Sequence, residues 1–306
     1  MKVSLISTVK DAGPHIGDFL SSVAEQTRNP DEVIITDGGS ADGTVETLRA
    51  AEGVTLIEEP GANISRGRVV AIAAAAHEVI AVSDADCVLE PQWLERLMVP
   101  IEQGADVAMG FYRAIYENFF QTCSAAVHLP DPGELDEATF MPSSRSVAFR
   151  RDAYDATGGY PTWLAVGEDM WLDHRFRELG MSMKLVPDAV ARWRVRPTLA
   201  QTWRQYYGYA RGDALAGMYP ERHLLRFGVY GAAAIVARWK IGRLLITLGG
   251  IAYAVRPIKR AFGLLPNDPM KKAGAIVAVP ALMFFTDLAK MAGYISGLVN
   301  RGKAQS

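Results

Sequence analysis

The sequence is poor in the residues that cross-link small secreted domains or build compact metal sites. Only two cysteines, Cys87 and Cys123, occur among its 306 residues. We therefore expect neither a disulfide framework nor a zinc site, and this cysteine usage fits a reducing compartment. The five histidines show no obvious ligand pattern, and no Gly-x-Ser-x-Gly motif marks a serine nucleophile.

Long uncharged hydrophobic runs are also missing. The C-terminal part has three apolar segments, at residues 227–237, 244–255 and 273–286. Each falls short of the roughly 20 residues that a simple membrane-spanning helix needs. At the other end, Met1 and Lys2 lead directly into a strand-like segment, so we expect no secretory signal.

Charge is divided unevenly along the chain. The net charge of −2 combines 14 basic and 30 acidic residues in positions 1–191 with 18 and 4 in positions 192–306, so −16 is followed by +14. A basic tail behind an acidic domain indicates attachment to an anionic surface. Because this tail is apolar, we expect a membrane surface and no nucleic acid.

Three arrangements of the tail are open. Interfacial or re-entrant helices are favoured. A spanning hairpin is less favoured, because it would carry the basic residues of positions 256–272 across the membrane, against the positive-inside bias. A helical pair buried against the catalytic domain is the third.

A short apolar strand ends in two carboxylates. Residues 79–83 (Val-Ile-Ala-Val-Ser) have the composition of a parallel strand buried on both faces, and Asp84-Ala85-Asp86 follows. Open α/β sheets bind ligands at this carboxyl edge. Hard oxygen ligands there suit Mg²⁺ or Mn²⁺ carrying a diphosphate. A solvated turn is the alternative.

The preceding residues form β-α repeats. We expect strands at residues 2–9, 32–36 and 54–58, and helices after Pro14 and over residues 63–76. The second strand ends in Asp37-Gly-Gly-Ser-Ala-Asp-Gly-Thr44, an acidic, glycine-rich turn.

The order and spacing of these motifs closely resemble the nucleotide-sugar half of family 2 glycosyltransferases, over roughly residues 1–215. The resemblance implies an α/β GT-A fold with a mixed sheet flanked by helices. It divides residues 1–215 into a nucleotide-sugar half (1–128) and an acceptor half (129–215). A helical, membrane-associated tail would occupy residues 216–306.

The resemblance also implies a donor site. Asp37 would accept a hydrogen bond from the base, commonly uracil, or would only cap its own turn. Asp84 would approach the ribose or a metal ion, and Asp86 would bind the metal. The other expected donor residues are Thr8, Val9 and Lys10 along the base, Arg66 and Arg68 near the base or diphosphate, and Ala85 between the two acids.

The acceptor side carries a second acidic motif, Gly167-Glu-Asp-Met-Trp171, at the start of a helix. By resemblance, Asp169 is the general base and Glu168 supports its orientation. Stabilisation by the helix dipole is the structural alternative. Arg145, Trp171 and Arg196 would contact the acceptor or the diphosphate.

The sequence departs from the family at one point. Many members carry a late histidine that completes the metal shell, whereas residues 189–197 contain none. The divalent cation, Mn²⁺ or Mg²⁺, would then be held by Asp86 and Asp84 with diphosphate and water, or arginines such as Arg196 would replace part of its charge.

These features predict an inverting transferase that moves one sugar from a nucleotide-diphosphate sugar, with UDP-sugars favoured by family frequency. We expect a lipid-linked or membrane-proximal acceptor at the cytoplasmic face, in the building of cell-envelope glycans. A sugar-phosphate nucleotidyltransferase and a non-catalytic membrane scaffold are the alternatives. Residues 8–13 match the glycine-rich opening loop of the former poorly.

Overall fold

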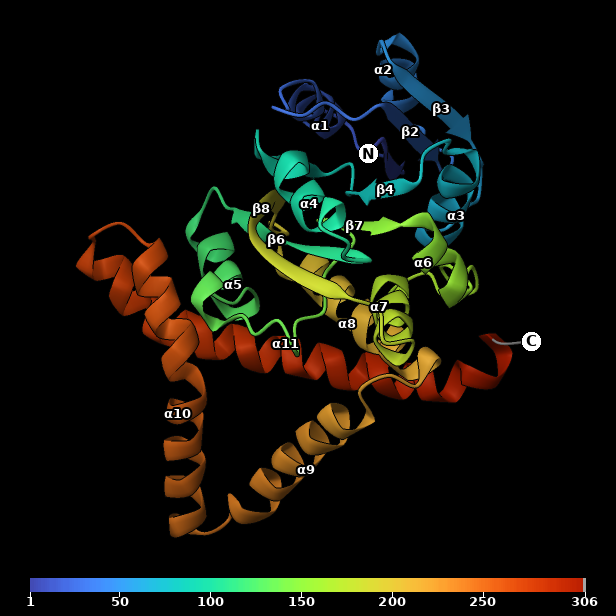
Figure 1. The fold of residues 1–306 in the computed structure, drawn as a ribbon. Helices are drawn as coiled ribbons and strands as arrows, with labels where there is room; N and C mark the ends of the chain where they lie inside the picture. The colour runs from blue at the N-terminus through green and yellow to red at the C-terminus, as the bar shows by residue number, and fades with distance from the viewer. Residues whose placement is uncertain (305–306) are drawn as a thin grey trace. The chain divides into compact units, whose positions relative to one another are not determined.

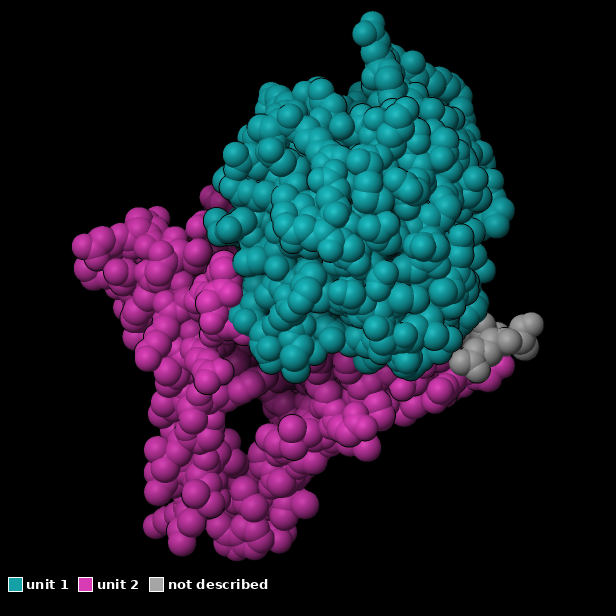
Figure 2. Space-filling view, in the orientation of Figure 1, with its two compact units in different colours: residues 1–114, 135–194 teal, residues 115–134, 195–306 magenta. Residues whose placement is uncertain are grey.

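A computed structural model describes residues 1–304 (Figure 1), which form two compact units. Unit 1 contains residues 1–114 and 135–194, and unit 2 contains residues 115–134 and the chain from 195 onward (Figure 2). The units divide the chain at other points than the expected boundary at 215. Helix α8 (Leu199–Ala216) belongs to unit 2 because it packs along α11 (Pro269–Ala304).

Unit 1 is built on one mixed sheet with the strand order β3-β2-β1-β4-β7-β6-β8-β5. Strands β1 to β4 are parallel, whereas β7 runs antiparallel to β4 and β6. The bounds are β1 Val3–Val9, β2 Glu32–Asp37, β3 Val54–Glu58, β4 Val79–Val82, β5 Cys87–Leu89, β6 Val107–Ile115, β7 Val147–Arg150 and β8 Met183–Arg194. The expected mixed α/β sheet is confirmed.

The central strands are buried on both faces. All four residues of β4 are fully buried, as their unbroken apolar sequence predicts for a parallel strand. One face packs on residues of α3, α6 and α7, which share an apolar core with β1, β4 and β7. The helices of unit 1 are α1 His15–Ala24, α2 Thr44–Ala50, α3 Ile64–Ala74, α4 Trp93–Glu102, α6 Arg151–Thr157 and α7 Glu168–Glu178.

A polar contact fastens α4 to the opposite face of the sheet. The indole Nε1 of Trp93 donates to Ser146 Oγ at 2.8 Å, and this hydroxyl donates to the carbonyl of Ala189 at 2.8 Å. Gly110 in β6 lies against the same hydroxyl: a Cβ at this position would approach Ser146 Oγ to 1.9 Å and Ala189 O to 2.8 Å. The close approach of the strands therefore requires glycine.

Unit 2 is helical. It contains α5 (Phe119–His128), a 3₁₀ turn (Pro132–Glu134), α8, α9 (Pro220–Val236), α10 (Lys240–Leu264) and α11. The first half of α11 shares an apolar cluster with α5 and the second half of α10. Further along, Gly293 and Gly297 bring α11 against the backbone of α8, because a Cβ at either position would overlap carbonyls of α8.

Much of this helical unit carries apolar side chains without protein cover. In α9, the first half of α10 and the link between them, large exposed hydrophobic residues include Leu224, Leu225, Val229, Ile235, Trp239, Ile241, Leu244, Leu245, Leu248 and Ile251. Helices α10 and α11 are each long enough and apolar enough to cross a membrane. Buried helices of soluble proteins meet the same two criteria, and 39% of the apolar window of α11 is buried here.

Gly110→Ala should lower the stability of unit 1. The new methyl group has no room between Ser146 and Ala189, and overpacking of this kind costs about 1–3 kcal/mol. The unfolding midpoint of the full-length protein in detergent measures the effect. Gly17→Ala is the matched control, because Gly17 lies in α1 with no heavy atom within 4 Å of a new Cβ. An unchanged midpoint for Gly110→Ala would contradict the packing described.

Candidate active site

The carboxylates of the Asp-x-Asp motif lie in the turn between β4 and β5, at the carboxyl edge of the parallel strands. The amide of Cys87 donates to the carbonyl of Asp84 at 3.0 Å, which closes the turn. Asp84 and Asp86 are half-buried, whereas Ala85 is buried. Cys87 is buried as well, and burial raises the pKa of its thiol well above the usual value, as expected for a structural cysteine.

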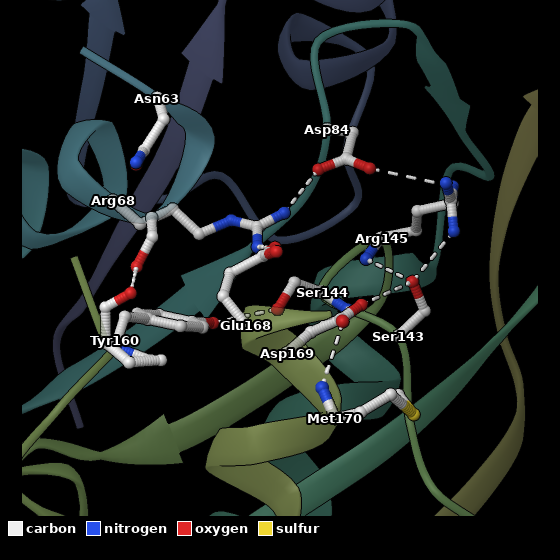
Figure 3. Close-up of polar contacts among 12 residues, drawn as sticks. Asn63, Arg68, Asp84, Ser143, Ser144, Arg145, Tyr160, Glu168, Asp169 and Met170 are labelled. Atoms are coloured by element: carbon white, nitrogen blue, oxygen red, sulfur yellow. Dashed lines mark hydrogen bonds and ion pairs between the residues drawn. The ribbon is translucent and has the colours of Figure 1, made fainter. Parts of the chain in front are cut away.

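Asp84 is paired with two arginines (Figure 3). Arg68 in α3 donates from Nη2 to Asp84 Oδ1 at 2.6 Å, and Nε of Arg145 lies 3.5 Å from Asp84 Oδ2. The guanidinium of Arg145 also lies over two aromatic rings, 4.8 Å from the centroid of Trp193 and 5.4 Å from that of Tyr112. Carboxylate and ring faces together fix this cation in place.

Arg68 is 1% exposed and contacts a second carboxylate. Its Nη1 donates to Oε1 of Glu168, the first residue of α7. Burial alone would lower the pKa of Arg68, but the two carboxylates outweigh it and raise this pKa, so the guanidinium stays charged. Burial raises the pKa of Glu168 to about 7, and the charge of Arg68 opposes that rise. The donor-side and acceptor-side acidic motifs are thus joined through one side chain.

Asp169 lies at the start of α7, where Gly167 has a φ of 88° and leads into the helix. Its Oδ1 accepts from the amide of Met170 at 2.9 Å, and its Oδ2 faces the hydroxyl of Ser143 at 3.4 Å and the amide of Ser144 at 3.5 Å. Ser143 Oγ also accepts from Arg145 Nη1 at 2.9 Å. A chain of polar contacts therefore runs from Asp169 through Ser143 and Arg145 to Asp84 (Figure 3).

The residues expected along the base lie at the ends of the first two strands. Asp37 ends β2 and is 2% exposed. It accepts from the amides of Gly39 and Ser40 and from the hydroxyl of Ser40, which are the contacts of the turn-capping alternative. Its role toward a base stays a prediction, as do those of Thr8 and Val9 in β1 and of the exposed Lys10.

The remaining predicted residues differ in their surroundings. Arg66 is exposed and pairs with Glu59 at 3.0 Å, in contrast to Arg68 two residues later. Trp171 is half-buried in the first turn of α7. Arg196 belongs to unit 2, and its role toward the acceptor or the diphosphate stays a prediction.

Three aromatic residues of the cluster were not among the predicted site residues. Tyr160 lies under Arg68 with its ring centroid 5.4 Å from the guanidinium, and Tyr112 and Trp193 hold Arg145. Tyr112 and Trp193 come from β6 and β8, and Tyr160 from the segment after α6. No local pattern marks them, because their role depends on the pairing of distant strands.

Within residues 1–304, no group of three or more His, Cys, Asp or Glu side chains is arranged to hold a metal ion. Both oxygens of Asp84 face guanidinium groups, and the role of Asp86 as a metal ligand stays a prediction. One carboxylate with substrate phosphates and water is a usual environment for Mg²⁺. The residues therefore fit a cation that binds together with a diphosphate.

Comparison with known proteins identifies the family. The sequence model for glycosyl transferase family 2 matches residues 4–157, about half of the chain. The glycosyltransferase AglE of Haloferax volcanii is 28% identical over 209 residues, which cover 64% of this chain and 67% of that protein. The succinoglycan biosynthesis protein ExoA of Rhizobium meliloti is 27% identical over 196 residues, covering 60% and 59%. The chain therefore belongs to glycosyltransferase family 2, and it is an enzyme of the glycosyltransferase class.

A solved structure supports the fold. The mannosyltransferase PcManGT from Pyrobaculum calidifontis, in complex with GDP-Man and Mn²⁺, aligns with a TM-score of 0.54 at 18% identity. The alignment covers 100% of this chain and 88% of that one. The expected GT-A fold is confirmed.

Asp86→Ala should lower turnover by about 10²-fold or more while leaving the fold intact, because a metal ion acting as Lewis acid contributes several kcal/mol. Sugar transfer in Mn²⁺, with circular dichroism as the folding check, measures both effects. Glu46→Ala, at an exposed carboxylate of α2, is the control and should be neutral. Wild-type turnover of Asp86→Ala, or full activity of the enzyme in excess chelator, would reject a metal role for this residue.

Proposed function

We propose that the protein is an inverting glycosyltransferase that transfers a single sugar from a nucleotide-diphosphate sugar to a lipid-linked or membrane-proximal acceptor. The observation that carries the proposal is the polar chain between Asp84 and Asp169. It holds a donor-side carboxylate at the sheet edge and an acceptor-side carboxylate at the start of α7 within one site, with Arg145 between them.

The acceptor side supplies the base. Asp169 takes the proton of the attacking hydroxyl on a carboxylate oxygen, while Met170 N and the 143–144 turn fix the orientation of the group. The hydroxyl oxygen then forms a bond to the anomeric carbon from the face opposite the diphosphate. The bond between this carbon and the diphosphate oxygen breaks, so the configuration of the sugar inverts and no covalent enzyme intermediate is needed.

The donor side stabilises the leaving group. The electron pair of the broken bond departs with the nucleoside diphosphate, whose negative charge the fixed guanidinium of Arg145 offsets. When bound, the divalent cation held by Asp86 would act as a Lewis acid on the diphosphate oxygens. Arg145 thus contributes positive charge in a chain that lacks the family's late histidine.

A direct assay can identify the base and the sugar of the donor. We favour a UDP-sugar, and GDP-mannose is the second candidate because the mannosyltransferase of similar fold is in complex with it. A panel of UDP-, GDP- and dTDP-sugars, each assayed for hydrolysis and binding with and without Mn²⁺, identifies the donor. Activity with none of them, or release of pyrophosphate from a nucleoside triphosphate and a sugar phosphate, would contradict the proposal.

We further propose that unit 2 binds the cytoplasmic face of a membrane through α9 and α10 lying at the interface. The exposed apolar residues of these helices meet at a corner with exposed Arg238, Trp239, Lys240 and Arg243. Arginine and lysine near an anionic leaflet contribute about 1 kcal/mol each, and tryptophan favours the interface. This surface places the enzyme beside acceptors that are themselves anchored in the membrane.

Asp169→Asn should lower the transfer rate by about 10²- to 10⁴-fold, because an amide of the same shape cannot accept the proton of the acceptor. Binding of the nucleoside diphosphate, measured by calorimetry, should stay nearly unchanged. Asp155→Asn, at an exposed aspartate of α6, is the control and should turn over at the wild-type rate. If Asp169→Asn loses nucleotide affinity and keeps its turnover, the residue belongs to the donor site instead.

Neutralising Arg238, Lys240 and Arg243 to glutamine should weaken binding to vesicles that contain anionic lipid, and about 1 M salt should release part of the wild-type protein. Flotation with liposomes measures both effects. The matched control changes three exposed basic residues of unit 1, Lys2, Arg49 and Lys184, to glutamine. Resistance to salt and carbonate would indicate a spanning hairpin, and recovery of the wild-type protein in the soluble fraction would indicate a buried helical pair.

A further inference from the structure

We propose that Arg68 is a positioning residue that holds the donor-side Asp84 and the acceptor-side Glu168 in one fixed relative geometry. The inference rests on the proposed function, since it assigns Arg68 a role in the same transfer reaction. It differs from the expectation that Arg68 contacts the base or diphosphate. With 1% of its surface exposed, the side chain is available to neighbouring residues and not to substrate.

The N-terminal turn of α3 is attached to the segment that leads into α7. Asn63 caps the helix by accepting from the amide of Arg66 at 2.8 Å, and its Nδ2 donates to the carbonyl of Thr162 at 2.8 Å. The hydroxyl of Ser65, two residues later, donates to the carbonyl of Pro161 at 2.7 Å. These contacts leave little freedom between the start of α3 and residues 160–162.

Arg68 extends this attachment to the acidic motifs. Its two terminal nitrogens contact Asp84 and Glu168 separately, and its guanidinium lies over the ring of Tyr160. Its third nitrogen, Nε, has no hydrogen-bond partner among the described residues. A planar fork with two donating ends can bridge two carboxylates, whereas the single ammonium of lysine cannot reproduce that geometry.

The positive charge of Arg68 also affects the pKa of Glu168. This carboxyl is 3% exposed, and burial raises its pKa while the charge of Arg68 opposes that rise. Without Arg68, the contact of Glu168 to α3 is lost, and the effect of burial, now unopposed by that charge, favours the protonated carboxyl. Asp169 follows Glu168 directly in the first turn of α7, so a shift of that turn moves the base.

Arg68→Met and Arg68→Lys test the inference, with turnover and nucleoside-diphosphate affinity measured separately on the full-length enzyme. Both variants should lower kcat by about 10²-fold, since a misplacement of about 1 Å can cost that much. Lysine should restore the unfolding midpoint more than the rate. Glu168→Gln should also lower kcat, but adding it to Arg68→Met should cost no more than about 2-fold further, because a neutral Glu168 already resembles glutamine.

Arg151→Met is the matched control. Arg151 is a partly buried arginine that donates to the carbonyls of Ile72, Ala75 and His77, at the other end of α3 and just beyond it, and it contacts no carboxylate of the site. Its loss should lower the unfolding midpoint while kcat stays within about 3-fold of wild type. A kcat that falls only in proportion to lost stability in all variants would show that Arg68 is merely structural.

The outcomes separate the two claims. If the wild-type enzyme transfers sugar but Arg68→Lys retains the wild-type kcat, or if the effects of Arg68→Met and Glu168→Gln multiply, the role of Arg68 is wrong and the proposed function stands. If the wild-type enzyme transfers no sugar from any nucleotide donor, the proposed function itself is wrong.

Discussion

The buried guanidinium of Arg68 bridges two carboxylates that lie about 80 residues apart in the chain, Asp84 and Glu168. Removing one partner from a buried ion pair typically costs about 3–5 kcal/mol, because the remaining charge is left without a partner in a poorly hydrated environment. For both ion pairs to form, α3, the turn after β4 and the start of α7 must lie close together. The rest of unit 1 holds them in that position.

The sheet brings these elements together. Parallel strands place Asp37 and the Asp84 turn at one edge, and antiparallel pairing of β7 with β4 places residues 143–145 beside that turn. A carboxylate pair alone would repel, but alternation with Arg68 and Arg145 gives a cluster of opposite charges. In the proposed reaction, the carboxylate of Asp169 accepts the proton and the guanidinium of Arg145 offsets the charge of the diphosphate.

Local sequence carried enough information for β1 to β4 and α3, because apolar strands alternate there with recognisable turns and helix starts, and the Gly-Glu-Asp motif marked the start of α7. It also marked Asp84, Asp86, Glu168 and Asp169 through motif spacing. It did not separate Arg66 from Arg68: both belong to the same basic helix start, and only packing shows that one is exposed and the other buried. Likewise, the grouping of α8 with the tail depends on glycines of α11, far along the chain.

The central claim is that a base and a diphosphate leaving group act on opposite faces of one sugar carbon. The stereochemistry of transfer tests it most directly. With an α-linked nucleotide sugar as donor, proton NMR of the first-formed product should show a β-linkage, as a single displacement assisted by Asp169 requires. An α-linked first product would mean a retained configuration and would contradict the account.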